Sequence, residues 1–198
     1  MHIIDDPLYG PAKIEEPVLL ELLQSAPIQR LRGIHQAGAS YLVHEGGEGI
    51  SRYEHCVGVM LLIRLLGSSV SEQTAGLLHD VSHTAFSHVG DYALERHDED
   101  YHEQCFEQLV NQSDIPEILD RHHLSSTALF ALEQWPLLEQ PAPDLCADRI
   151  DYTLRELFSR HVIPPSQIQH FLSALAISEG KIITTNGEAA LWFTHIYA

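Results

Sequence analysis

The spacing of apolar and polar positions along the chain predicts a series of helices. In most segments apolar residues recur at i, i+3 and i+4, which is typical of helices that bury one face. Ser71 and Ser125 each precede such a segment and are expected to act as N-caps. The expected helices cover residues 16–24, 27–36, 53–66, 72–81, 84–94, 100–111, 115–119, 127–135, 144–161 and 164–176, followed by a last helix from Glu188.

Shorter segments interrupt this pattern. Residues 7–11 indicate an extended lead-in, the glycine-rich residues 40–49 a loop, and the proline-rich residues 136–143 a linker-like loop. Residues 181–185 are rich in β-formers and end in the turn signal Asn186-Gly187, which predicts a small hairpin beside the last helix. The expected fold class is therefore all-α, a helical bundle with a small β-hairpin near the C-terminus.

Length and composition favour one domain over residues 1–198. A chain of 198 residues, 44% of them hydrophobic, can bury a sizeable core, and no apolar run is long enough to cross a bilayer. The first residues lack a basic segment followed by an apolar one, so we expect no secretory leader. Three distant cysteines (Cys56, Cys105 and Cys146) argue against a disulfide framework and a cysteine-type zinc knuckle. These features favour a cytoplasmic protein without a membrane partner.

The charge balance narrows the range of partners. Eleven basic residues face 28 acidic ones, which gives a net charge of −17. The electrostatic field of so negative a protein repels the phosphates of a nucleic-acid backbone, so we expect no nucleic-acid partner. It also repels a nucleotide, and a phosphate substrate would therefore need a local cation. The 14 histidines are a high count for a residue suited to metal binding and proton transfer.

Four polar residues stand out. His55 lies in the apolar expected helix 53–66, His79 and Asp80 follow the apolar Leu77-Leu78, and Asp148 lies in the expected helix 144–161. A buried polar group left unpaired costs about 1–3 kcal/mol, and one divalent cation would satisfy all four. Their nitrogen and oxygen donors suit Fe, Mn, Zn, Ni or Co better than calcium. Taken singly, however, a helical histidine is more often a hydrogen-bonded core residue, and a His-Asp pair is a weak signal.

Longer motifs around these residues carry a family resemblance. Residues 29–36 (QRLRGIHQ), 51–59 (SRYEHCVGV), 78–88 (LHDVSHTAFSH) and 147–152 (ADRIDY) occur in this order. The chain resembles the HD-domain metal-dependent phosphohydrolases, and within them the deoxynucleoside triphosphate triphosphohydrolase branch. The resemblance extends over residues 29–156, and residues 164–198 add the expected C-terminal helices and hairpin.

The resemblance implies roles for individual residues. It makes His55, His79, Asp80 and Asp148 the metal ligands, and it places His83, His88 and His102 around the phosphates. Asp91 would orient His88, which lies three positions earlier on the same helix face and would protonate the leaving oxygen. Arg52 would contact the phosphates. Gln36, Tyr152 and Glu156 would contact the rest of the substrate. For these histidines, Asp91 and Arg52, a role at the surface or as a helix cap is the competing interpretation.

The chain departs from the family pattern at two positions that would contact the sugar of a nucleotide substrate. Ala37 stands where the family has a larger aliphatic residue, which puts a preference for deoxyribose in doubt. Glu156 stands where the family has aspartate.

The chain also ends at Ala198 within an apolar stretch, whereas the family continues with more helices. A compact hydrolase and a shortened form of a longer protein are both compatible with this, as is a homo-oligomer.

The sequence thus predicts a metal-dependent phosphohydrolase that acts on a nucleotide, in first place a (deoxy)nucleoside triphosphate, with Mg also able to accompany the substrate. Metal-activated water would attack phosphorus. Hydrolysis of nucleoside monophosphates or another small phosphoester is the alternative. A non-catalytic metal-binding regulatory module is the second alternative, although such a module would not need the outer histidines.

Overall fold

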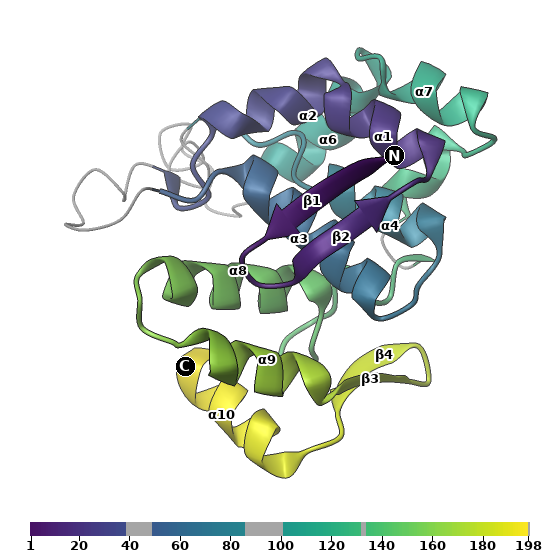
Figure 1. Ribbon diagram of the computed structural model, residues 1–198. Helices are drawn as coiled ribbons and strands as arrows, with labels where there is room; N and C mark the ends of the chain where they lie inside the picture. The colour runs from purple at the N-terminus through teal and green to yellow at the C-terminus, as the bar shows by residue number, and fades with distance from the viewer. Residues whose placement is uncertain (39–48, 86–100, 132–133, 198) are drawn as a thin grey trace.

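The computed structural model describes residues 1–38, 49–85, 101–131 and 134–197, with the side chains of 101–104 excluded. Among these described residues, helices predominate, and two separate two-stranded antiparallel sheets accompany them (Figure 1). The strands are β1 (His2–Asp6), β2 (Gly10–Ile14), β3 (Leu175–Ser178) and β4 (Lys181–Thr184). The helices are α1 (Pro17–Gln24), α2 (Ala26–Arg30), η1 (Leu31–Gly33), α3 (Arg52–Leu65), α4 (Val70–Leu78), α6 (Tyr101–Asn111), α7 (Ile115–Arg121), η3 (Ser126–Phe130), α8 (Ala147–Ser159), α9 (Pro165–Ser173) and α10 (Gly187–Tyr197). The expected mostly helical fold is confirmed.

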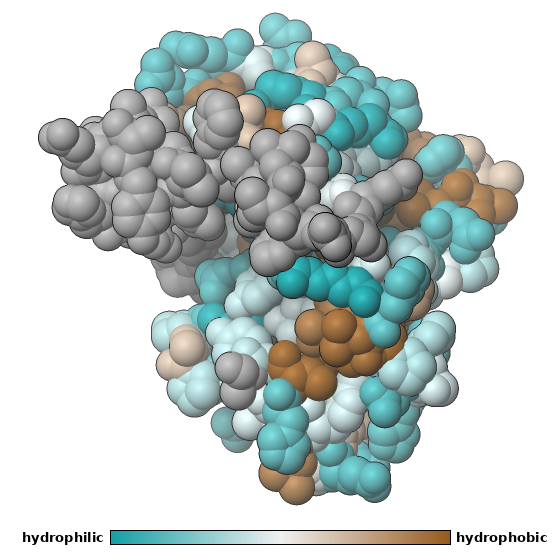
Figure 2. Space-filling model, turned by 90° about the vertical axis from the view of Figure 1, so that its left-hand side faces the viewer, coloured by the Kyte–Doolittle hydropathy of each residue, from teal (hydrophilic) through white to brown (hydrophobic). Residues whose placement is uncertain are grey.

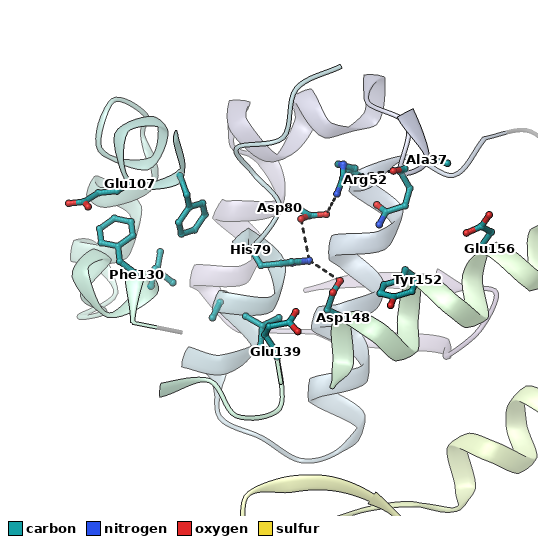
Figure 3. A pocket seen from close by; sticks show the side chains of 15 residues that line it. Ala37, Arg52, His79, Asp80, Glu107, Phe130, Glu139, Asp148, Tyr152 and Glu156 are labelled. Carbon is teal, nitrogen blue, oxygen red and sulfur yellow. Dashed lines mark hydrogen bonds and ion pairs between the residues drawn. The ribbon is translucent and has the colours of Figure 1, made fainter. Parts of the chain in front are cut away.

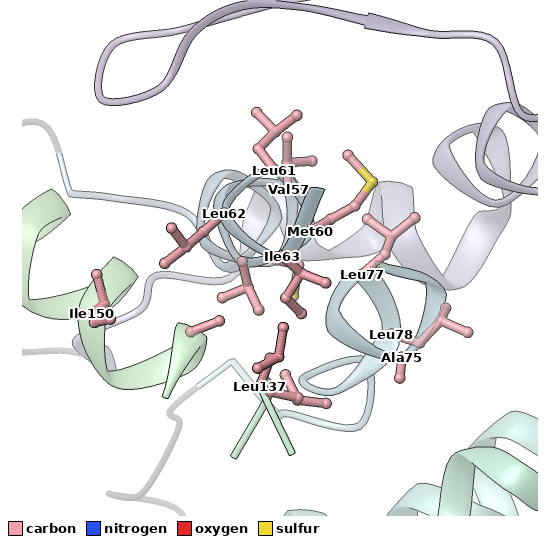
Figure 4. Close-up of a cluster of buried hydrophobic side chains, with 14 of the residues drawn as sticks. Val57, Met60, Leu61, Leu62, Ile63, Ala75, Leu77, Leu78, Leu137 and Ile150 are labelled. Atoms are coloured by element: carbon pink, nitrogen blue, oxygen red, sulfur yellow. The ribbon is translucent and has the colours of Figure 1, made fainter. Parts of the chain in front are cut away.

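The core is built around α3 and α4, which pack side by side. Ser51 and Glu54 form a capping box at the start of α3, which fixes where this helix begins. α3 is buried along most of its length, and Figure 4 shows Met60 and Ile63 of α3 beside Leu77 of α4, while Leu62 points toward the side on which Ile150 of α8 lies. Ser69, and not the expected Ser71, caps α4, because its hydroxyl accepts from the backbone N–H of Glu72. The helix predicted over 72–81 accordingly begins and ends earlier, at Val70 and Leu78.

The N-terminal hairpin β1–β2 was not predicted. His2 pairs with Ile14 and Asp6 with Gly10. The hairpin lies in front of α3 in the view of Figure 1, and Arg64 of α3 donates to the carbonyl oxygen of Lys13 in β2 at 3.0 Å. The Asp6 carboxylate accepts backbone N–H groups of Leu8 and Tyr9 at 2.9 and 3.2 Å and so closes the turn. Residues 7–11, expected to be an extended lead-in, therefore form this turn and the start of β2.

At the C-terminal end, the expected small hairpin is confirmed as β3–β4, but its turn is elsewhere. Glu179 and Gly180, both with positive φ, make the turn, and Asn186 instead caps α10 by accepting the N–H of Glu188 at 2.8 Å. Because Leu175 enters β3, the helix expected over 164–176 ends at Ser173.

Other predicted helices are shorter. The segment 27–36 turns from α2 through η1 into extended backbone at Ile34, because His35 bridges to Ser51. The helix expected over 127–135 is only the short 3-10 helix η3. The helix predicted over 144–161 starts at Ala147, because Leu145 bridges to Ile182 of β4. Most of the expected helix 84–94 and of the loop 40–49 lies outside the described residues.

The surface agrees with the acidic composition. Figure 2 shows a face that is largely hydrophilic, with apolar side chains gathered in a patch in its lower half. Within the described ranges, the chain has no helix that combines the length and the apolar character needed to cross a bilayer.

Candidate metal centre and adjoining cavity

Three helices bring the four candidate ligands together. α3 supplies His55, the chain directly after α4 supplies His79 and Asp80, and the first turn of α8 supplies Asp148. Asp148 Oδ1 lies 2.8 Å from His55 Nε2 and 3.4 Å from His79 Nε2. The two Nε2 atoms are 3.3 Å apart, and the Asp80 oxygens lie 3.8 Å from His55 Nε2 and 3.6 Å from His79 Nε2. Figure 3 shows His79, Asp80 and Asp148 pointing toward one another.

This donor set fits a divalent transition metal. One ligand atom from each of His55, His79 and Asp80 lies within 4.8 Å of the others, and Asp148 faces both imidazoles. Two imidazole nitrogens with carboxylate oxygens are ligands that such metals prefer. The metal-site hypothesis requires Asp148 to lie close to His55 and to the His79-Asp80 pair, and in the structure it does.

Each imidazole has its second nitrogen fixed by an acceptor. His79 Nδ1 lies 2.8 Å from the carbonyl oxygen of Gly76, and His55 Nδ1 lies 2.8 Å from Asp151 Oδ1. An N–H on Nδ1 satisfies these acceptors and leaves the Nε2 lone pair for a cation. Asp151 was not singled out from the sequence. Its position three residues after Asp148, on the same face of an amphipathic helix, was the available signal.

Charges in the centre stabilise one another. Burial alone would lower the pKa of both histidines, but Asp80 raises that of His79, and Asp148 and Asp151 raise that of His55. Burial would raise the pKa of Asp80, yet the positive charges of His79 and Arg52 hold it well below its usual range. A cation would replace the protons that these groups share.

Arg52 and His83 both lie against Asp80. Arg52 is buried and forms an ion pair with Asp80, and its other terminal nitrogen lies 3.4 Å from the Gln36 carbonyl oxygen. His83 Nε2 lies 3.2 Å from Asp80 Oδ1. Arg30, which the sequence did not single out, donates to the carbonyls of Val81 and His83 at 2.6 and 2.9 Å, and so holds the backbone that follows Asp80.

A cavity of about 700 Å³ adjoins the centre. All four predicted substrate-binding residues line it (Gln36, Arg52, Tyr152 and Glu156), together with Ala37. The opposite wall includes Phe106 and Phe130, whose rings meet edge to face at 5.8 Å between centroids, together with Glu107. Figure 3 shows Phe130 and Glu107 across the cavity from Tyr152 and Glu156.

Glu139 is a second residue that the sequence did not indicate. It lines the cavity near Asp148, and burial together with the Asp148 charge raises its pKa. Its segment was expected only to be a linker-like loop, and it has no periodicity or motif that could have indicated Glu139.

The predicted catalytic residues His88 and Asp91 lie outside the described residues. The backbone of His102 belongs to α6, but its side chain is likewise not described.

Known proteins similar to this chain share its motif region. Residues 52–156 match the HD domain. Over 98% of the chain it is 50% identical to protein YdhJ of Bacillus subtilis and 38% identical to the metal-dependent phosphohydrolase cns2 of Cordyceps militaris. Over 63% of the chain it is 33% identical to human deoxynucleoside triphosphate triphosphohydrolase SAMHD1, of which it covers 23%.

Solved structures support the fold. The crystal structure of a hypothetical protein from Aquifex aeolicus aligns with 99% of this chain at a TM-score of 0.68 and 27% identity, and the alignment covers 57% of that protein. The chain spans 59% of YdhJ and 58% of cns2.

Proposed function

Because this chain belongs to the HD domain family, we propose that it is a metal-dependent phosphohydrolase that acts on a nucleotide. One observation carries the proposal: two imidazoles and two carboxylates from α3, α8 and the residues directly after α4 converge beside a cavity of about 700 Å³. The name of cns2, a metal-dependent phosphohydrolase, supports the same reaction class.

In this proposal, His55, His79, Asp80 and Asp148 hold a divalent cation. Such an ion would polarise a phosphoryl oxygen and lower the pKa of a water molecule toward about 7. Arg52, which lies beside Asp80, provides a fixed positive charge for the phosphoryl oxygens. The outer residues of the family pattern, His83, His88 with Asp91, and His102, would neutralise phosphate charge and protonate the leaving oxygen.

The rest of the cavity suits a nucleoside. The aromatic side chains of Phe106 and Phe130 offer an apolar wall for a base. Tyr152 and Glu156 project from α8 on the other side, where hydroxyl groups of a sugar would find polar partners. The motif resemblance favours a (deoxy)nucleoside triphosphate as the substrate. The small side chain of Ala37, also in the lining, leaves room for a 2′-hydroxyl.

The charge of the lining favours a second candidate, a nucleoside monophosphate or another small phosphoester. Among the described lining residues, Arg52 is the only arginine or lysine, whereas five are aspartates or glutamates. A triphosphate brings more negative charge than a monophosphate into this acidic surrounding, and so needs more cationic partners.

A nucleotide panel tests the proposal and separates the candidates. The purified chain is assayed with Mn, Fe, Co, Ni or Zn, with and without Mg, on nucleoside mono- and triphosphates of both sugars, and the products are identified. Release of intact triphosphate supports the first candidate, and release of inorganic phosphate from monophosphates supports the second.

The matched controls are alanine variants. His79→Ala combined with Asp80→Ala is expected to lower turnover at least a hundredfold, because it removes two ligands, whereas His195→Ala, an exposed histidine on α10, should leave turnover unchanged. Wild-type turnover in the double variant would contradict the proposal. Metal binding by a chain that hydrolyses none of the panel would favour the non-catalytic regulatory module.

A further inference from the structure

The N-terminal hairpin reaches the metal centre from outside the segment that matches the HD domain. Its turn carries Tyr9, whose hydroxyl donates to Asp151 Oδ2 at 2.9 Å. In the same turn, Asp6 Oδ2 lies 3.0 Å from a terminal nitrogen of Arg155 on α8. Residues 6 and 9 both precede the matched residues 52–156, so these contacts join the matched segment to a part of the chain outside it.

Asp151 is the point at which these contacts meet. Its carboxylate is fully buried and accepts from Arg155 Nε and a terminal nitrogen at 2.9 and 2.8 Å. With the Tyr9 hydroxyl and His55 Nδ1, four donors surround the two carboxylate oxygens. A buried charge is stable only when it is paired in this way, and the bidentate arginine fixes the plane of the carboxylate.

The backbone of α3 leaves room for this arrangement. A Cβ atom built on Gly58 would lie 2.1 Å from both Asp151 Oδ2 and an Arg155 terminal nitrogen, so a side chain there would displace the ion pair. Gly58 follows His55 by three residues and lies on the same face of α3. Only glycine lets α8 carry Asp151 close enough to the His55 ring.

We propose that Asp151, held by Tyr9 and Arg155, is the positioning residue that keeps His55 protonated on Nδ1 with Nε2 facing the cation, so that the N-terminal hairpin forms part of the metal centre. The inference rests on the proposed function in one respect, namely that the four ligands bind a cation. Carboxylate partners of metal-binding histidines fix the ring and its tautomer in this manner, and their loss typically weakens metal binding about 10- to 100-fold.

Metal titration of the whole chain tests the inference without any turnover. Asp151→Asn keeps the shape of the side chain but removes the charge. We expect it to weaken Co(II) and Zn(II) binding by about 10- to 100-fold and to shift the visible absorption bands of the bound cobalt. Tyr9→Phe removes only the hydroxyl and should have a smaller effect in the same direction. Tyr53→Phe, in the first turn of α3, is the matched control and should bind metal like the wild type.

A double variant separates positioning from a general loss of structure. In a His55→Ala background, Asp151→Asn should weaken metal binding no further, because the carboxylate acts through the missing ring. If the wild type binds no metal, the proposed function fails. If the wild type binds metal and both Asp151→Asn and Tyr9→Phe bind it equally well, with the same cobalt spectrum, only the present inference is overturned.

Should Asp151→Asn fail to fold, Tyr9→Phe decides the question. Weaker metal binding with an unchanged melting temperature of the metal-free chain supports the inference. Wild-type affinity and spectrum in that variant contradict it.

Discussion

At the scale of single residues, the histidines and carboxylates of the candidate metal centre share protons that a bound cation would displace. The pKa of His55 and the pKa of His79 are both raised, although burial acts in the opposite direction, because carboxylates surround the rings. Metal ligation requires the neutral imidazole, so protons and cation compete for the same Nε2 atoms.

This competition predicts how metal affinity depends on pH. Between the ordinary histidine pKa of about 6.5 and the raised values, the metal-free centre binds protons that a model imidazole would already have lost. Affinity should therefore fall as the pH is lowered through the raised pKa values and level off above them. Calorimetric titration in buffers of different ionisation enthalpy measures both the affinity and the protons released. Affinity that stays constant across this range would contradict the assignment of the histidines.

The metal candidates could be found from the sequence because they lie in motifs that resemble those of a known family, whereas a polar residue beside an apolar run is a weak signal when taken singly. The structure brings His55, His79, Asp80 and Asp148 together. Asp151 did not stand out, because an acidic residue in a helix normally lies in solvent. Its role depends on Tyr9, 142 positions away, and no local pattern reports such a contact.

At the scale of the elements, helix existence was predictable and helix ends were not. The capping box at Ser51 makes the start of α3 recognisable, and this helix differs from its prediction by one residue at each end. The hairpin β1–β2 escaped prediction because its short strands carry charges and one proline, Pro11. The Asp6 carboxylate supplies the hydrogen bonds that close the turn. Leu145 and Leu175 leave helical periodicity because they take part in β-pairing, which is a non-local effect.

The two serines before α4 give a test at this scale. Ser69→Ala removes the side chain that accepts the Glu72 N–H, and we expect it to lower the free energy of unfolding by about 1 kcal/mol. Ser71→Ala changes a residue inside the helix and should alter it by less than about 0.5 kcal/mol. Urea denaturation of the two variants beside the wild type measures the difference. Equal losses, or a larger loss for Ser71→Ala, would contradict the capping assignment.

At the scale of the whole molecule, the four candidate ligands join three helices that are distant in the sequence. A cation bound by α3, α8 and the end of α4 would cross-link the helices that form the core. Because the unfolded chain lacks this site, the ion should stabilise the folded state in proportion to its occupancy.

Chelation tests this cross-link. A cation at a hundred times its dissociation constant adds about 2.7 kcal/mol to the free energy of unfolding. Treatment with a chelator should therefore lower the melting temperature by several degrees, and Mn or Zn should restore it. The His79→Ala variant should have the same melting temperature with and without the chelator. Calorimetric or fluorescence melting curves measure the shift, and a wild type insensitive to chelation would speak against a bound ion.

The contact between Tyr9 and Asp151 also bears on how the protein is made. A nascent chain exposes the tyrosine long before the ribosome has produced the carboxylate that receives it, 142 residues later. Long-range contacts of this kind form late in folding, since the intervening chain has to be ordered first. The cation would thus be acquired after synthesis has passed α8, by a chain already largely folded, so metal supply would limit maturation and not the first steps of folding.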